Sequence, residues 1–307
     1  MASPGGAWHA GLAARPRLAA LLGAACIAFA AIFVRLADVS PTTATVFRCL
    51  YALPVLGVLA LLERHRYGPR AGPQLRMAML AGVFFAIDLT AFHYAIGLVG
   101  AGLATVLANL QVVIVAVVAW MLLGERPSGR LIVSIPLAIL GAVLISGLLE
   151  QGAYGSDPGL GVGFGLLAAV TYAGYLLILR RSGADLRRPA GPVFESTAAA
   201  LLVAAAGGLA IGGLDLAPSW PAHGWLLALA LVAQAAGGLL IVVSLPRLPA
   251  ALTSITLTAQ PIGTMVLGVA LLGERPSPGQ LAGVGLILAG LLIASVSRAR
   301  TLPAPAT

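Results

Sequence analysis

Asp88 is a charged residue in the middle of the long apolar run 76–97. A carboxylate at the centre of a bilayer-length apolar run is costly unless it is paired, wetted or protonated. On a helix it shares a face with Phe92, so it could point into an aromatic-lined space. Asp88 is therefore a candidate for binding a substrate ammonium group or for carrying a proton, and a structural hydrogen bond is the alternative.

Arg48, Glu195 and His93 are further ionisable residues inside apolar runs. Arg48 could close an outer gate or attract a substrate carboxylate, and snorkelling to the outer headgroups is the alternative. Glu195 can reach the arginines at 180–188, where we expect a salt bridge. His93 follows Asp88 by about 140° around a helix, so the two do not form one dyad, and packing is the simpler interpretation of His93.

The elements that position these residues must suit a bilayer. Of the 307 residues, 60% are hydrophobic and 9% are charged, and the mean hydropathy is +1.01. A soluble domain carries about 25% charged residues to wet its surface, which excludes a soluble enzyme, a nucleic-acid-binding protein and a secreted disulfide scaffold. Cys26 and Cys49 lack metal-ligand spacing and there is no nucleotide-binding loop, so we expect no cofactor, no metal and no nucleic-acid partner.

Ten apolar runs can each cross a bilayer as a helix. They cover residues 18–37, 42–62, 76–97, 101–122, 130–149, 160–180, 191–212, 224–245, 250–272 and 280–298. The predicted fold class is an all-α integral membrane protein with ten transmembrane helices. Its predicted parts are a tail at 1–17, five helices within 18–149, a linker at 150–159, five helices within 160–298, and a tail at 299–307.

The basic residues indicate the orientation. All 18 are arginines, and 15 of them fall on one side of the predicted membrane. Because basic loops stay in the cytoplasm, we expect this side, with both tails, to be cytoplasmic. The 150–159 linker is then external, and the predicted location is the cell (inner) membrane, crossed many times.

An internal repeat is the strongest feature of the chain. The block Leu-Leu-Gly-Glu-Arg-Pro-Ser occurs at 122–128 and again at 271–277, which is 149 positions later, and Gly141 matches Gly290 at the same offset. Each half holds five runs, an odd number, so the second half must cross the membrane in the opposite sense. Inverted five-helix repeats are typical of secondary transporters, whose substrate site lies near the midplane between the halves.

The two Glu-Arg-Pro turns contain groups capable of chemistry, yet they are expected on opposite faces of the membrane. One active site cannot occupy both sides. We therefore expect these turns to end helices, with Gly and Pro as terminators and Arg near the last carbonyls.

The repeated blocks, together with residues 31–35 and Phe47-Arg48, resemble the EamA-type ten-helix members of the drug/metabolite transporter superfamily. The resemblance covers about residues 18–298 as two EamA modules. It implies a carrier that exports amino acids, other metabolites or drugs, although some members import. The run 250–272 keeps the Gln-Pro pair of the family, whereas Val112 follows Gln111 in the run 101–122, so two equivalent proline kinks are not expected.

Polar and aromatic side chains in the middle of the runs are candidates for lining a substrate site. Such residues often only pack or form hydrogen bonds between helices, which is the alternative for each. The predicted substrate-binding residues are Asp88, Phe92, Tyr94, Asn109, Gln111, Tyr172, Tyr175, Gln234, Thr258 and Gln260. The predicted gating residues are Arg48 and Pro261, the latter because proline frees a carbonyl on the preceding turn.

The sequence therefore predicts a secondary transporter, not an enzyme, which moves small metabolites, with amino acids preferred, outward by alternating access. Its expected partners are a small-molecule substrate and the lipid bilayer, with a proton as the candidate coupling ion, and it is either a monomer or a homodimer. An importer or a drug-efflux carrier of the same fold is the alternative, and an integral-membrane lipid-modifying enzyme is a further one.

Overall fold

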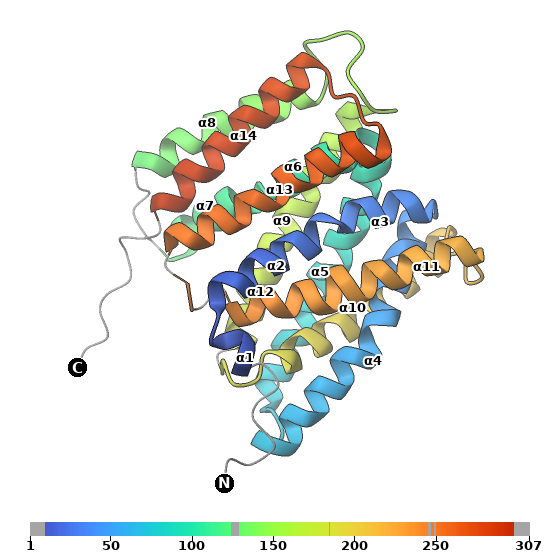
Figure 1. Cartoon of the computed structure of the whole chain (residues 1–307), viewed down its shortest axis with the longest axis vertical. Coiled ribbons are helices and arrows are strands. Elements are labelled where there is room, and N and C mark those ends of the chain that lie inside the picture. Colours follow the sequence, from blue (N-terminus) through green and yellow to red (C-terminus); the bar gives the residue numbers. More distant parts are fainter. Residues whose placement is uncertain (1–9, 124–128, 184, 245–246, 249, 298–307) are drawn as a thin grey trace.

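The computed structural model describes residues 10–123, 129–183, 185–244, 247–248 and 250–297. Every regular element in these residues is a helix (Figure 1). The first Glu-Arg-Pro turn, most of the predicted tail at 1–17 and the whole predicted tail at 299–307 lie outside the described residues.

The predicted tail and the first five predicted runs form eight helices. They are α1 (Ala10–Ala13), α2 (Pro16–Ala28), α3 (Ala30–Ala37), α4 (Pro41–Tyr67), α5 (Gly72–Val99), α6 (Ala101–Ala108), α7 (Gln111–Leu123) and α8 (Gly129–Ile145). The second five runs form α9 (Pro158–Ser182), α10 (Ala190–Ile211), α11 (Trp220–Ala228), the π-helix η1 (Leu229–Gly237), α12 (Gly238–Ser244), α13 (Ala250–Leu272) and α14 (Pro278–Ser297). The linker between the halves is longer than predicted, because α8 ends at Ile145 and α9 begins at Pro158.

The helices suit a bilayer in length and composition. Seven helical segments are long and apolar enough to cross a membrane, and three shorter apolar helices lie at Gly129–Ile145, Thr258–Leu272 and Pro278–Ala294. Large apolar side chains are also widely exposed on the outside of the bundle, with Leu148 at 78% and Ile211 at 86%. A surface of this kind is satisfied by lipid rather than by water, so the chain is a multi-pass integral membrane protein.

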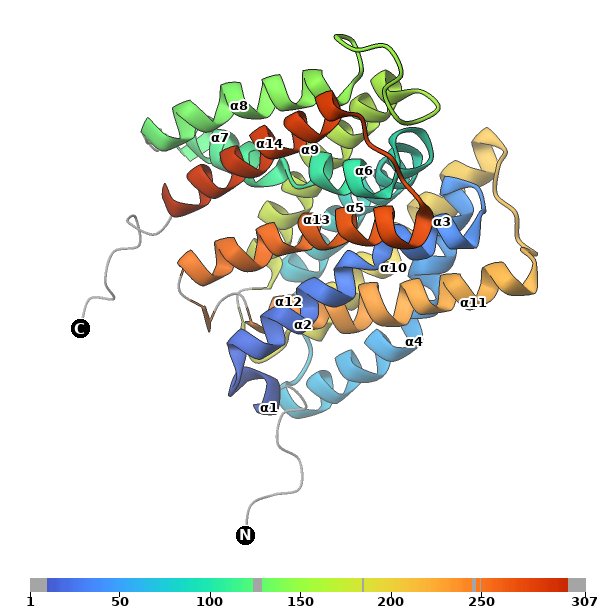
Figure 2. The same cartoon turned by 45° about the horizontal axis from the view of Figure 1, so that its top comes forward.

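The bundle is built around α5, which packs along α9, while α10 packs against both α4 and α5. The helices α8 and α14 run side by side along one edge, and α4 lies toward the opposite edge (Figures 1 and 2). We call the end at which α4 ends and α5 begins the Arg-rich end, because the loops at 68–71 and 183–189 carry arginines there. The opposite end, where α5 ends and α6 begins, is the Arg-poor end.

Three of the predicted runs are interrupted in the middle. The first breaks between α2 and α3, where the Thr264 hydroxyl donates to the Ala28 carbonyl oxygen at 2.9 Å. The fourth breaks between α6 and α7, where the Asn109 side chain donates to the Thr105 carbonyl oxygen at 2.9 Å. The Asn109 amide competes with the backbone for that carbonyl, and the next backbone bonds take the tighter i→i+3 form, as from Leu110 to Leu107.

The position of these breaks differs from the pattern that the prolines suggest. Pro261 lies inside α13, which is assigned as one continuous helix from Ala250 to Leu272. The run without a matching proline is the one that breaks, at Asn109. The eighth run is interrupted by η1, a π-helix without a proline. Polar side chains and i→i+5 bonding therefore disrupt these helices, and proline does not.

The contact between α8 and α14 relates the two halves. Gly141 lies so close to α14 that an added Cβ would be 2.7 Å from the Gly283 carbonyl oxygen. An added Cβ on Gly290 would be 3.2 Å from the Ser134 carbonyl oxygen. Gly290 follows Gly141 by 149 residues, and Gly283 follows Ser134 by the same 149. Replacing each residue of one contact by its repeat counterpart therefore gives the other contact.

Candidate functional site

A cavity of about 170 Å³ lies in the middle of the bundle. All three interrupted runs contribute to its wall, through Ile27 and Ala30, through Asn109 and Gln111, and through Gln234. Its polar lining consists of Arg48, Asp88, Thr105, Asn109, Gln111, Tyr172, Tyr175, Gln234 and Gln260. Interrupted helices that line a central site are a recurrent feature of transporters, because the break frees backbone and polar groups at the midplane.

Arg48 is the cation of this cavity. Its side chain comes from α4 and is 7% exposed, so it turns into the bundle, which contradicts snorkelling to the headgroups. The Nε atom donates to the Gln234 Oε1 atom of η1 at 3.0 Å. The Nη1 atom is buried and has no hydrogen-bond partner among the described residues. A buried guanidinium N–H without a partner can donate a hydrogen bond to a ligand oxygen.

Asp88 is the anion of the cavity. It comes from α5, is buried, and makes no hydrogen bond within the described part of the chain, so the structural bond considered for it is not found there. Asp88 and Arg48 are close enough to interact electrostatically. Asp88 and Arg48 form no salt bridge with each other among the described residues. The site thus holds one acidic and one basic group that could each bind a ligand group of opposite charge.

The break in the fourth run adds an acceptor. Gln111 begins α7 just after the break, and its Oε1 atom is buried without a partner among the described residues. Asn109, by contrast, uses its amide to hold the Thr105 carbonyl. Gln111 is therefore available to a ligand donor, whereas Asn109 mainly shapes the wall.

Aromatic rings form one wall. Phe85 stacks on Tyr175 with ring centroids 4.4 Å apart, and Tyr172 stacks on Tyr175 at 5.5 Å. Phe84, the neighbour of Phe85, points elsewhere and packs against Gly174 of α9. These stacked rings give the cavity an aromatic wall beside its charged groups.

The cavity brings together most of the predicted site residues. Those that line it are Arg48, Asp88, Phe92, Asn109, Gln111, Tyr172, Tyr175, Gln234 and Gln260. Tyr94 is outside the lining and stacks on Phe164 with centroids 5.0 Å apart. Thr258 is buried in α13 but does not line the cavity, and neither does Pro261.

His93 lies outside the cavity, toward the Arg-poor end. Its Nδ1 atom lies 2.9 Å from the Thr45 hydroxyl and 3.3 Å from the Pro41 carbonyl oxygen, while its Nε2 atom has no partner among the described residues. His93 therefore helps to pack α5 against α4 above the cavity, as the simpler interpretation of the sequence predicts.

The lining is skewed toward the Arg-rich end. Leu179 and Val193 line the cavity within about one turn of the ends of α9 and α10 at that end. On the other side the lining reaches Thr105, about one turn inside α6, and Phe92, about two turns before the end of α5. The Arg-poor end is therefore the more heavily covered one.

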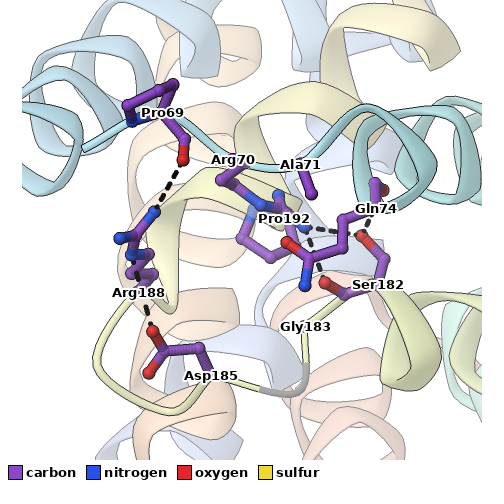
Figure 3. A pocket seen from close by; sticks show the side chains of 9 residues that line it. All are labelled: Pro69, Arg70, Ala71, Gln74, Ser182, Gly183, Asp185, Arg188 and Pro192. Carbon is purple, nitrogen blue, oxygen red and sulfur yellow. Dashed lines mark hydrogen bonds and ion pairs between the residues drawn. The ribbon is translucent and has the colours of Figure 1, made fainter. Parts of the chain in front are cut away.

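A polar cluster joins the two halves at the Arg-rich end (Figure 3). Arg70 donates to Glu195 at 2.6 Å and to the carbonyl and hydroxyl oxygens of Ser182, each at 2.7 Å. The sequence predicts that Glu195 pairs with the arginines at 180–188. This prediction is wrong, because Glu195 forms its salt bridge with Arg70 from the α4–α5 loop. Burial lowers the pKa of the Arg70 guanidinium, and the Glu195 carboxylate opposes that shift.

The same cluster caps two helices. Arg188 donates to the Gly68 carbonyl oxygen at 3.0 Å and also to the Tyr67 carbonyl at the end of α4. Glu63 accepts from the backbone N–H groups of Ala190 and Gly191 at the start of α10, at 2.9 and 2.8 Å. The positive Arg188 thus lies at the C-terminal end of α4, and the negative Glu63 lies at the N-terminal end of α10. Each helix dipole favours the charge at its end. A polar pocket of about 220 Å³ lies beside these residues.

Comparison with known proteins places these features in a family. The model of the EamA-like transporter family matches residues 16–147 and again residues 159–296. This chain belongs to the EamA-like transporter family. The resemblance predicted from the Glu-Arg-Pro blocks is therefore confirmed.

No curated protein matches this EamA-like transporter. A solved structure described only as "Crystal structure of protein" is 18% identical to it. That match covers 94% of this chain and 99% of the other, with a TM-score of 0.59. At this identity the likeness concerns the fold alone.

Sequence reasoning missed part of the lining of this EamA-like transporter. Thr105, Phe85 and Val193 all line the cavity without having been predicted as site residues. Thr105 carried a signal, because it lies one turn before Asn109 on the same face. Phe85 and Val193 carried none, since apolar side chains are favourable on every face of a membrane helix.

Proposed function

We propose that this EamA-like chain is a secondary transporter that exports small zwitterionic metabolites, with α-amino acids as the preferred class, by alternating access. The observation that carries the proposal is the central cavity, whose lining includes Arg48, Asp88 and Gln111. The Arg48 Nη1 atom and the Gln111 Oε1 atom have no hydrogen-bond partner in the described part of the chain. A zwitterion is the simplest small molecule that satisfies all three.

The recognition follows from the charges. The substrate carboxylate binds the Arg48 guanidinium, which can use its fork geometry for a planar anion. The substrate ammonium group binds Asp88 and donates a further hydrogen bond to Gln111. The side chain of the substrate lies against the wall formed by Phe85, Tyr172 and Tyr175.

The size of the cavity favours a small metabolite over a drug. Sites for drug-sized ligands occupy about 300–1,000 Å³, whereas this cavity measures about 170 Å³. A drug-efflux role is therefore disfavoured.

The proposed topology has ten spans in two inverted halves with both ends of the chain in the cytoplasm. It is supported by the exchange of the Gly141–Gly283 and Ser134–Gly290 contacts under the 149-residue offset. The excess of arginines at one end supports the orientation. In this orientation the cavity is skewed toward the cytoplasm, the side from which an exported substrate enters.

Proton exchange accounts for the direction. Asp88 can hold either a substrate ammonium group or a proton, but not both. Release of the substrate outside therefore leaves Asp88 ready to take a proton, which returns inward on the same carboxylate. An inward proton gradient then drives outward movement of the substrate.

The experiment is transport by the purified chain in proteoliposomes, with and without an imposed pH gradient. The panel contains labelled amino acids and two matched controls, namely amines without the carboxylate and carboxylic acids without the amine. We expect gradient-dependent accumulation of amino acids and little movement of either control. Equal transport of amines and amino acids would contradict the role of Arg48, and simple equilibration would contradict proton exchange.

A further inference from the structure

Glu274 lies in the second Glu-Arg-Pro turn, directly after α13, and its side chain does not end its own helix. The residue is 2% exposed. Its two carboxylate oxygens accept hydrogen bonds from the backbone N–H groups of Ala101 at 2.5 Å and Gly102 at 3.0 Å, the first two residues of α6. A carboxylate in this place satisfies two free donors and the positive end of the helix dipole.

The space for this carboxylate is made by glycines. A Cβ added to Gly268 would collide with the Glu274 Oε2 atom, and one added to Gly100 would lie 2.9 Å from Oε1. A Cβ added to Gly102 would lie 3.2 Å from Oε2. The Glu274 backbone N–H also donates to the Gly268 carbonyl oxygen at 3.1 Å. Glycines of α6 and of α13 thus hold one charged group between them.

This contact lies above the cavity at the Arg-poor end. The Thr105 hydroxyl lines the cavity and donates to the Ala101 carbonyl oxygen at 2.8 Å, one turn below the residue whose N–H Glu274 binds. The helix α6 belongs to the first family segment and α13 to the second, and the two pack together (Figure 2). An opening of the cavity toward the Arg-poor end between these two elements separates Glu274 from the start of α6.

We propose that Glu274 is a latch, a positioning residue that keeps the Arg-poor end closed and leaves the N-terminus of α6 when that end opens. The proposal rests on the alternating access proposed above, though not on the identity of the substrate. It gives the Glu of the repeated block a task beyond forming a turn, since the charge holds one half of the chain to the other.

The test measures access to the cavity. A single cysteine replaces Ala108, which lines the cavity, in a background with Cys26→Ala and Cys49→Ala. A membrane-impermeant maleimide is applied to the Arg-poor side or to the Arg-rich side of sealed vesicles. Two variants release the latch independently: Glu274→Gln removes the charge, and Gly268→Ala fills the space of the carboxylate while keeping the charge.

We expect both variants to be labelled about tenfold faster from the Arg-poor side, the order of effect for losing charged hydrogen bonds across a closed interface, and more slowly from the Arg-rich side. The matched control is Glu150→Gln, because Glu150 accepts from the Ser277 hydroxyl at 2.6 Å and from the Gly279 N–H at 3.1 Å at the start of α14, away from the cavity. The control should be labelled like the parent.

Unchanged labelling from the Arg-poor side in both variants overturns the latch. A rise from both sides alike also overturns it, because that pattern indicates a loosened fold instead of an exchange of accessible ends. No substrate enters this assay. Faster labelling from the Arg-poor side together with slower labelling from the Arg-rich side therefore supports the latch, even if none of the tested substrates is transported. If amino acids are transported but the labelling is unchanged, the latch is wrong and the proposed function stands.

Discussion

Arg48 and Gln234 join the two family segments across the cavity. The Arg48 Nε atom donates to Gln234 Oε1 at 3.0 Å, and the Gln234 Nε2 atom donates onward to the Thr197 hydroxyl at 3.3 Å. Gln234 lies in the π-helix η1, whose wider turn presents its side chain to the cavity. The guanidinium is therefore held in one orientation, while its buried Nη1 atom has no hydrogen-bond partner among the described residues.

Arg48→Lys should weaken substrate binding and thereby slow transport at low substrate concentration. Lysine keeps the charge but loses the planar fork that holds both Gln234 and a carboxylate, so we expect the KM for an amino acid to rise about tenfold or more. Gln234→Leu should raise the KM by less, because the guanidinium remains and only its orientation is freed. Initial rates in proteoliposomes measure both, and an unaltered KM in Arg48→Lys contradicts carboxylate binding at this residue.

Asp88→Asn should uncouple the carrier. The amide is nearly isosteric with the carboxyl group but can neither carry a proton nor pair with an ammonium group. We expect accumulation driven by a pH gradient to disappear, with a residual rate that no longer depends on pH. Rates across a range of external pH, for Asp88→Asn beside the parent, make the comparison. Transport and pH dependence that survive intact in this variant remove Asp88 from the mechanism.

The sequence predicted the apolar runs, the repeat and the charged residues of the cavity better than it predicted the shape of the helices. Asp88, Arg48 and Gln111 were identifiable because a polar group inside a bilayer-length run needs a reason to be there. The helix breaks were not identifiable from the sequence. The break at Asn109 depends on its side-chain amide competing for the Thr105 carbonyl, whereas the sequence pattern suggested a break at Pro261. The path of η1 likewise has no marker in its Ala- and Leu-rich sequence.

The sequence also did not predict which residues from distant parts of the chain contact each other. Glu195 pairs with Arg70 and Glu274 binds the start of α6, although each has arginines nearer in sequence. Which partner each carboxylate meets is decided by how the helices cross, as α13 crosses α6 and α10 crosses α4 and α5. Hydropathy alone does not contain that information. Tyr94 was expected in the site for its type and depth, yet it faces Phe164.

Gly141→Val should destabilise the protein by removing the close approach of α8 and α14. The new side chain would meet the Ile287 side chain at 2.6 Å and the Gly283 carbonyl oxygen at 2.7 Å, and overpacking of this kind costs about 1–3 kcal/mol. Gly285→Val, on α14 but facing open space, is the matched control. Thermal unfolding in detergent should show a midpoint several degrees lower for Gly141→Val only. Equal midpoints would mean that this helix pair does not depend on close packing.

Labelling of loop cysteines should separate the two ends of the bundle. Gln151 lies in the linker between α8 and α9 at the Arg-poor end, and Leu186 lies in the loop between α9 and α10 at the Arg-rich end; both are exposed. Because arginine-rich loops stay in the cytoplasm, Gln151→Cys should react with an impermeant maleimide on intact cells, whereas Leu186→Cys should react only after the membrane is opened. Ser277 is less suitable, because its hydroxyl is bound to Glu150. Reaction of both cysteines in intact cells contradicts a crossing of the membrane by α9, the helix between them. Reaction of Leu186→Cys alone reverses the orientation and with it the assignment of the cavity to the cytoplasmic side.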